Sequence, residues 1–123
     1  MKIVIKQPKN EIEVKDITLN LENLKKIIGG NIEYVMLNKE LDKRGIFAYG
    51  DDEAKCKYQT PNFWIYDKQD FFCGTAIFCK DNGQGEETDL TDDDIKLIKQ
   101  FLKVNKMSEN EVEENQAFLR RIF

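Results

Sequence analysis

The sequence predicts an α+β domain, with a mostly antiparallel sheet of about five strands that starts in the order β-β-α-β and two C-terminal helices. The first observation behind this prediction is the apolar run at residues 71–79, which is rich in aromatic and β-branched residues and is bounded by turn and charge signals. Both of its faces are apolar, so we expect one strand at the centre of the sheet. The second observation is a pair of helix-capping patterns near the C-terminus.

The N-terminal part predicts the β-β-α-β order. Residues 2–6 and 11–17 alternate between apolar and polar side chains, which indicates an antiparallel hairpin. Asn20 is a good N-cap for a helix with an apolar stripe, and Gly29-Gly30 is placed to end that helix, with one of the two glycines in the left-handed conformation. Residues 31–37 then predict a third strand.

The middle of the chain is less regular. We expect the charged residues 38–44 to form a loop and residues 45–49 to form a short strand. Residues 57–66 are predicted to be extended, and Pro61 confines them to a sheet edge or an irregular segment. An acidic loop follows the central strand.

Both C-terminal helices have clear start signals. Thr91 with Asp94, and Ser108 with Glu111, match the capping box in which the N-cap and N3 side chains satisfy each other's backbone N–H groups. We expect one domain over residues 1–123, because a chain of this length builds a single core.

Composition narrows the function classes. The net charge is −4 with mixed signs, which argues against general nucleic-acid binding. No apolar stretch is long enough to span a bilayer and the N-terminus lacks signal-peptide features, so we expect a cytoplasmic protein. There is no histidine, and Cys56, Cys73 and Cys79 lack metal-site or redox spacing, so we expect reduced thiols, no metal, no cofactor and no catalytic activity. On a single strand, Cys73 and Cys79 would share one face.

One set of aromatic, basic and amide residues is a candidate ligand pocket. Aromatic side chains would stack on a nucleotide base, and cations would meet its phosphates. The alternative, which we favour, is that Trp64 and its neighbours complete the core. The candidate residues are Arg44, Lys57, Tyr58, Asn62, Trp64 and Tyr66.

The stretch 81–94 holds seven carboxylates and no Lys or Arg. It could be a phosphate-mimicking surface, a site for a hard cation, or a solvated loop leading into a helix N-terminus, which is the commonest case. The residues of the mimicking surface would be Glu86, Glu87, Asp89, Asp92 and Asp93.

The last helix is polar in its first half, and Arg120 and Arg121 suit the negative end of its dipole. Such a helix could pack on a second copy of the chain, so a homo-oligomer is also possible.

The order and spacing of several segments resemble a known family. The segments are Lys2-Ile3-Val4, Ile27-Ile28-Gly29-Gly30-Asn31-Ile32-Glu33, Pro61-Asn62, Asp70-Phe71-Phe72-Cys73-Gly74-Thr75-Ala76-Ile77-Phe78 and Leu90-Thr91-Asp92-Asp93. Together they are similar to a domain of unknown function found in small proteins of phages, plasmids and their Gram-positive hosts. The resemblance covers residues 1–103 and leaves the C-terminal helix at 104–123 outside it.

The resemblance implies a setting rather than an activity. Small proteins of mobile elements often neutralise a host defence system in the bacterial cytoplasm. The favoured expectation is sequestration of a nucleotide-type immune signal, without direct binding to nucleic acid or to a membrane. The alternatives are an inhibitor of a host nuclease, anti-restriction or anti-CRISPR, that binds a host defence protein through the acidic surface, and a structural module with no such role.

Overall fold

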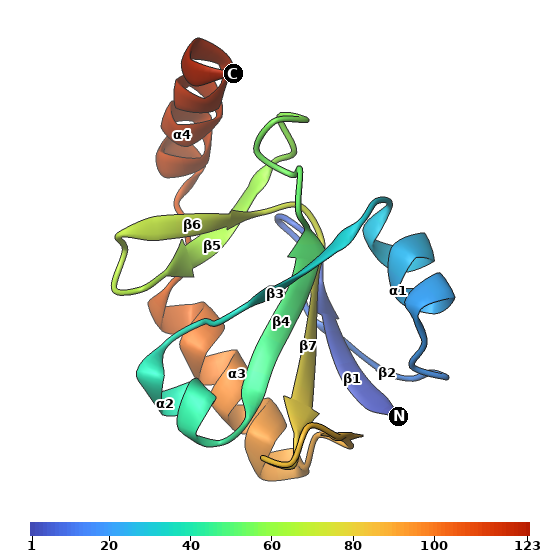
Figure 1. Ribbon diagram of the computed structural model, residues 1–123. Helices are drawn as coiled ribbons and strands as arrows, with labels where there is room; N and C mark the ends of the chain where they lie inside the picture. Colours follow the sequence, from blue (N-terminus) through green and yellow to red (C-terminus); the bar gives the residue numbers. More distant parts are fainter.

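A computed structural model describes all 123 residues and confirms the α+β class (Figure 1). The strands are β1 (Lys2–Lys6), β2 (Glu13–Asp16), β3 (Ile32–Val35), β4 (Ile46–Asp51), β5 (Pro61–Ile65), β6 (Asp70–Cys73), β7 (Ala76–Asp81) and β8 (Glu87–Thr88). The main sheet has the strand order β2-β1-β7-β4-β3 and is antiparallel throughout, and β8 also pairs with β7. β5 and β6 form a separate two-stranded sheet.

The two faces of the main sheet are covered by different helices. α1 (Leu21–Ile28) lies on one face, and α3 (Asp92–Val104) lies on the other (Figure 1). Successive side chains of a strand point to opposite faces, so each strand contributes to both sides of the core. The cluster beneath α1 includes Ile3, Ile5, Leu24, Ile28, Phe47, Ile77 and Cys79. The cluster beneath α3 includes Val4, Ala48, Phe63, Phe72, Phe78, Ile98, Phe101 and Leu102.

Local capping signals place the helices as predicted. The Asn20 side chain accepts a hydrogen bond from the Asn23 N–H at the start of α1, and Gly29 ends the helix with φ of 84°. Both capping boxes are formed, at the starts of α3 and of α4 (Glu109–Ile122). None of the helices combines the length and the apolar character needed to cross a membrane.

The prediction of one continuous strand over residues 71–79 is wrong. The run divides into β6 and β7 because Gly74 adopts the left-handed conformation, with φ of 76°. The Gly74 N–H donates to the Thr60 carbonyl at 2.9 Å, and its own carbonyl accepts from the Asn62 amide at 2.8 Å. These contacts replace the ladder hydrogen bonds that a continuous strand would make. β7 does lie at the centre of the main sheet, between β1 and β4, while β6 pairs with β5.

The break also separates the cysteines. Cys79 lies in the cluster beneath α1, whereas Cys73 lies in a third cluster against α4. They therefore do not share one face of one strand, as the sequence suggested. Burial raises the pKa of each thiol to about 12, and neither forms a disulfide.

Two further expectations need correction. The predicted loop at 38–44 contains a short helix, α2 (Lys39–Lys43), because the Asn38 side chain accepts from the Leu41 N–H and caps it. The predicted extended segment 57–66 is a strand only over Pro61–Ile65, which is β5. Proline is tolerated there because it is the first residue of a strand that pairs with only one other strand, β6. Tyr58 and Tyr66 have positive φ, so they do not continue the side-chain alternation of β5.

α4 packs beyond the β5–β6 hairpin rather than on the main sheet (Figure 1). Its buried side chains, Val112 and Leu119, join Phe71 and Cys73 of β6 in the third cluster. The hairpin therefore lies between the main core and the C-terminal helix, with apolar contacts on both sides.

Replacing Gly74 with Ala tests the cause of the break. Three other glycines, Gly29, Gly83 and Gly85, have a similar positive φ without the crowding, and we choose Gly83 (φ 82°), where an added Cβ has no neighbour within 4 Å. At Gly74 the added Cβ overlaps the Gln59 side-chain amide. We expect Gly83→Ala to lower the free energy of unfolding by about 1 kcal/mol and Gly74→Ala to lower it by about 2 kcal/mol or more, measured by urea denaturation. Equal losses would show that crowding at Gly74 plays no part.

Candidate functional site

Two cavities of ligand size border the β5–β6 hairpin. One has a volume of about 350 Å³ and is lined by the far end of the hairpin, β3 and the turn after β4. The other has a volume of about 460 Å³ and lies between the start of β5, the β1–β2 loop and the α3–α4 connection. Both fall in the range of about 300–1,000 Å³ that is typical of small-molecule sites. Their charges are opposite.

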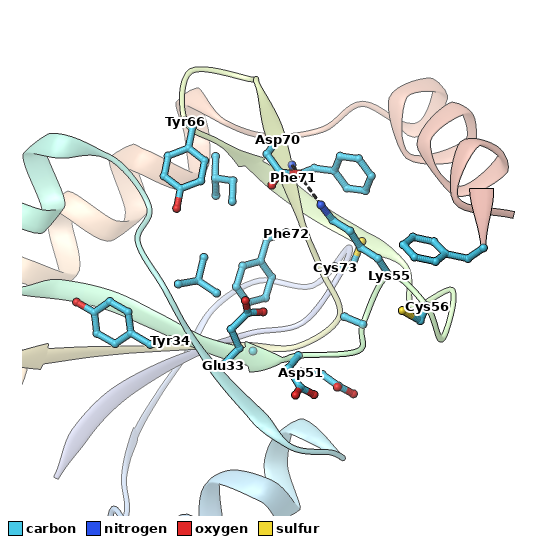
Figure 2. Close-up of a pocket in the computed structure, with 16 residues that line it drawn as sticks. Glu33, Tyr34, Asp51, Lys55, Cys56, Tyr66, Asp70, Phe71, Phe72 and Cys73 are labelled. Atoms are coloured by element: carbon cyan, nitrogen blue, oxygen red, sulfur yellow. Dashed lines mark hydrogen bonds and ion pairs between the residues drawn. The ribbon is translucent and has the colours of Figure 1, made fainter. Parts of the chain in front are cut away.

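The first of these, the acidic cavity, is lined by four acidic residues, Glu33, Asp51, Asp52 and Asp70, and by one basic residue, Lys55 (Figure 2). Figure 2 shows Lys55 extending toward Asp70, and its Nζ lies 2.5 Å from Asp70 Oδ1. The ammonium is also 4.8 Å from the centre of the Phe71 ring. The single cation of this cavity is thus already paired, and the net negative charge opposes the binding of an anion.

The second, the lysine cavity, is lined by five lysines, Lys6, Lys9, Lys99, Lys103 and Lys106. Its only acidic lining residue is Glu11. None of the five ammonium groups forms an ion pair in the structure. A chain with a net charge of −4 therefore carries a local basic site in which five lysines face one acidic residue.

Asn62 of β5 positions one side of the lysine cavity. Its side chain is almost fully buried, and its Nδ2 donates to the carbonyls of Lys6 at 2.9 Å and Gly74 at 2.8 Å. Its Oδ1 accepts from Lys6 Nζ at 3.0 Å, and Lys6 Nζ also donates to the Gln7 carbonyl at 2.7 Å. The ammonium of Lys6 has three N–H groups, so one remains for a ligand.

Phe63, the next residue of β5, positions the other side. It forms an isolated antiparallel bridge with Lys106, and the neighbouring Trp64 N–H donates to the Asn105 carbonyl at 2.9 Å. The Phe63 ring is buried in the core, 5.0 Å from the ring of Phe72 and 5.7 Å from that of Phe101. One short stretch of β5 thus fixes the β1 side and the α3 side of the cavity relative to each other.

The surroundings of Lys6 disfavour the charged form of its ammonium group. Lys6 is half-buried, and burial lowers the pKa of its ammonium below the usual lysine range. The negative charge of Glu11 opposes this shift, and the positive charge of Lys106 adds to it. An anion in the cavity would stabilise the charged form of Lys6.

Of the six residues predicted to form a ligand pocket, only Asn62 borders the lysine cavity. An Nη atom of Arg44 lies 3.3 Å from Asp94 Oδ1, and Lys57 Nζ lies 2.7 Å from Asp51 Oδ2. Both carboxylates are buried, so the two cations are committed to internal ion pairs.

The predicted aromatic residues do not gather around one cavity. Tyr66 borders the acidic cavity, whereas the Tyr58 hydroxyl donates to the Phe123 carbonyl at 2.5 Å. Trp64 packs against the third cluster, with its ring centre 6.1 Å from that of Phe71 in an edge-to-face arrangement. Trp64 therefore occupies the position of a core residue.

The five predicted acidic-surface residues have different surroundings. Glu87 accepts a hydrogen bond from the Tyr49 hydroxyl, and Asp89 Oδ1 accepts from the Lys2 N–H at 2.7 Å. Glu86 is exposed, and so are Asp92 and Asp93 in the first turn of α3. Nowhere does the chain bring together three His, Cys, Asp or Glu side chains in a way that would hold a metal ion.

The lysine cavity was missed because its residues are distant in the sequence. One signal was present: Lys99, Lys103 and Lys106 recur at a spacing of four and three residues, which places Lys99 and Lys103 on one side of α3, with Lys106 just beyond its end. Lys6 and Lys9, however, join them only when the β1–β2 hairpin folds against α3.

Comparison with known proteins gives one match. A family model described as Domain of unknown function (DUF3846) matches residues 1–103. No curated protein and no solved structure matches the chain. The matched region includes Lys6, Lys9, Asn62, Lys99 and Lys103 but not Lys106 or α4.

Asp94 provides a test of the ion pairs that hold Arg44. It lies at the start of α3, fully buried, and accepts from Lys80 Nζ at 2.9 Å and from the Thr91 N–H at 2.8 Å. Burial alone would raise the pKa of Asp94, but the hydrogen bonds from Thr91 and Lys80 outweigh it and hold this pKa below its usual range. Because the folded-state pKa is depressed, the stabilisation is present above pH 3.8 and is lost as the pH falls below it.

We expect Asp94→Asn to lower the free energy of unfolding at pH 7 by about 2 kcal/mol, because two cations lose their charged partner. The difference from the wild type should narrow as the pH falls below 3.8, measured by urea denaturation at several pH values. The control is Asp93→Asn, which removes an exposed carboxylate of the same helix turn. A difference in the free energy of unfolding that does not change with pH would contradict the conclusion that the charged form of Asp94 stabilises the fold.

Proposed function

This chain belongs to the family described as Domain of unknown function (DUF3846), and from that premise we propose that it is a non-catalytic binding protein whose lysine cavity captures an anionic, nucleotide-type ligand. The family description names no activity, so the argument for a ligand comes from the cavity. The observation that carries it is the set of five lysines that line one cavity of about 460 Å³ and form no ion pair.

Phosphate is the anion that best suits this arrangement. A lysine ammonium binds phosphate as a point charge, and charge-assisted hydrogen bonds are about twice as strong as neutral ones. The lysines approach from two sides, and Lys6 is held in place by Asn62 before any ligand arrives. A pre-positioned donor loses less conformational freedom when it binds.

The floor of the lysine cavity supports a nucleotide rather than a bare inorganic ion. The apolar lining side chains provide a surface for a base and a ribose, since ligand pockets combine an apolar wall with a few polar groups. These side chains come from the β1–β2 loop, the start of β5 and the two C-terminal helices with their connection: Ile12, Pro61, Phe63, Leu102, Met107 and Val112.

Capture rather than turnover fits the residues at this site. The ionisable side chains that line the cavity are the five lysines and Glu11, and the chain contains no histidine. The buried thiols of Cys73 and Cys79 lie in other parts of the core, and their raised pKa values keep them protonated at neutral pH.

The biological role follows from the sequence resemblance rather than from the cavity. In the setting of a phage or another mobile element, a protein that captures a nucleotide immune signal in the host cytoplasm would deprive a defence effector of its activator. The same capture could serve another role in another setting, so the ligand is tested separately from the role.

The cavity is tested with adenosine triphosphate as the probe, in calorimetric titrations of the wild type and of Lys103→Gln. We expect the variant to bind about fivefold more weakly, because an exposed charge contact contributes about 1 kcal/mol. The matched control is Lys96→Gln, which makes the same charge change on an exposed residue of α3 outside the cavity.

Equal losses in the two lysine variants would mean that only the general charge of the protein matters, which would contradict the proposal. A triple variant of the acidic surface, Glu86→Gln with Asp92→Asn and Asp93→Asn, should bind the probe at least as tightly as the wild type. A loss of binding there would also contradict the proposal.

A further inference from the structure

We infer that the nucleotide captured by the lysine cavity carries at least three negative charges on its phosphate groups and is not a simple monophosphate. This inference rests on the proposed function and narrows it. It is carried by the number of unpaired cations in the cavity and by their separation on two walls.

The first step is the charge of the cavity. Five lysines and one glutamate, Glu11, line the cavity, so its lining has an excess of four positive charges. A phosphate monoester carries about two negative charges at neutral pH, so a monophosphate would leave the cavity only half compensated. A ligand with three or four charges would come close to neutrality.

The second step is the separation of the cations. Lys99 and Lys103 are one helical turn apart, about 6 Å along the axis of α3, and Lys106 lies beyond the end of the helix. Lys6 and Lys9 stand on the β1–β2 side of the same cavity. A single phosphate cannot contact both walls and the whole row, whereas several phosphate groups can.

The third step is the repulsion among the cations in the free protein. Lys106 acts on the half-buried Lys6 as a like charge, and the pKa of Lys6 is lowered in part for this reason. Each additional ligand charge relieves more of this repulsion. Affinity should therefore rise with the number of phosphate groups and should fall with salt more steeply for the more highly charged ligands.

The experiment is a calorimetric titration of the full chain with adenosine mono-, di- and triphosphate at one ionic strength in a metal-free buffer. We expect the dissociation constant to fall roughly 30-fold from the monophosphate to the triphosphate, with the diphosphate between them. In Lys103→Gln the ratio should shrink, whereas in Lys96→Gln it should be unchanged. Equal affinity for the three nucleotides would overturn the inference and leave the proposed function standing.

Two further probes separate the sources of the charge. Inorganic triphosphate should bind, but more weakly than adenosine triphosphate, because it makes no contact with the apolar floor. A cyclic dinucleotide, with two charges, should bind more weakly than the triphosphate, and tighter binding would overturn the charge requirement. If none of these probes binds, the proposed function itself is refuted. A short single-stranded oligonucleotide that bound more tightly than all of them would indicate nucleic-acid binding and would overturn both.

Discussion

The buried side-chain amide of Asn62 is the contact on which the rest of the arrangement depends. Its two N–H groups bind the carbonyls of Lys6 and Gly74, and its oxygen accepts from the Lys6 ammonium. The first two bonds attach the β5–β6 hairpin to the end of β1 and to the break before β7. The third bond holds the Lys6 side chain, which lines the lysine cavity. An unsatisfied buried polar group is costly, so this network favours one placement of the hairpin.

The β5–β6 hairpin separates two cavities of opposite charge. The start of β5 borders the lysine cavity, and the far end of the hairpin borders the acidic cavity shown in Figure 2. In the acidic cavity and its surroundings, Lys55 and Lys57 are paired with Asp70 and Asp51. In the lysine cavity the cations have no such partners. The net charge of the chain conceals this separation, so the composition, which argued against general nucleic-acid binding, did not indicate a local group of lysines.

The sequence predicted what local chemistry determines. The caps at Asn20, Thr91 and Ser108 and the apolar β7 region lie where they were expected. It did not predict the break at Gly74, because a glycine within an apolar run is compatible with a strand until a distant Asn62 and Thr60 bind its backbone. The short helix α2 was hidden by its charged composition, although its N-cap Asn38 was a readable signal.

The candidate site was harder to predict than the fold. Asn62 was selected as a ligand residue and does border the lysine cavity, but the cations chosen with it form ion pairs with buried carboxylates. The lysines that line the cavity are spread from Lys6 to Lys106, and only the folding of the β1–β2 hairpin against α3 brings them together. The lysine spacing near the end of α3 could have identified half of the site at most, since the opposite wall depends on tertiary contacts.

The most direct test of the lysine cavity is an NMR titration that observes the ammonium and adjacent methylene signals of every lysine while adenosine triphosphate is added. The account predicts that the largest changes fall on Lys6, Lys9, Lys99, Lys103 and Lys106. Lys55 and Lys57, beside the acidic cavity, should change little. Changes centred on those two residues, or spread evenly over all the lysines, would contradict it.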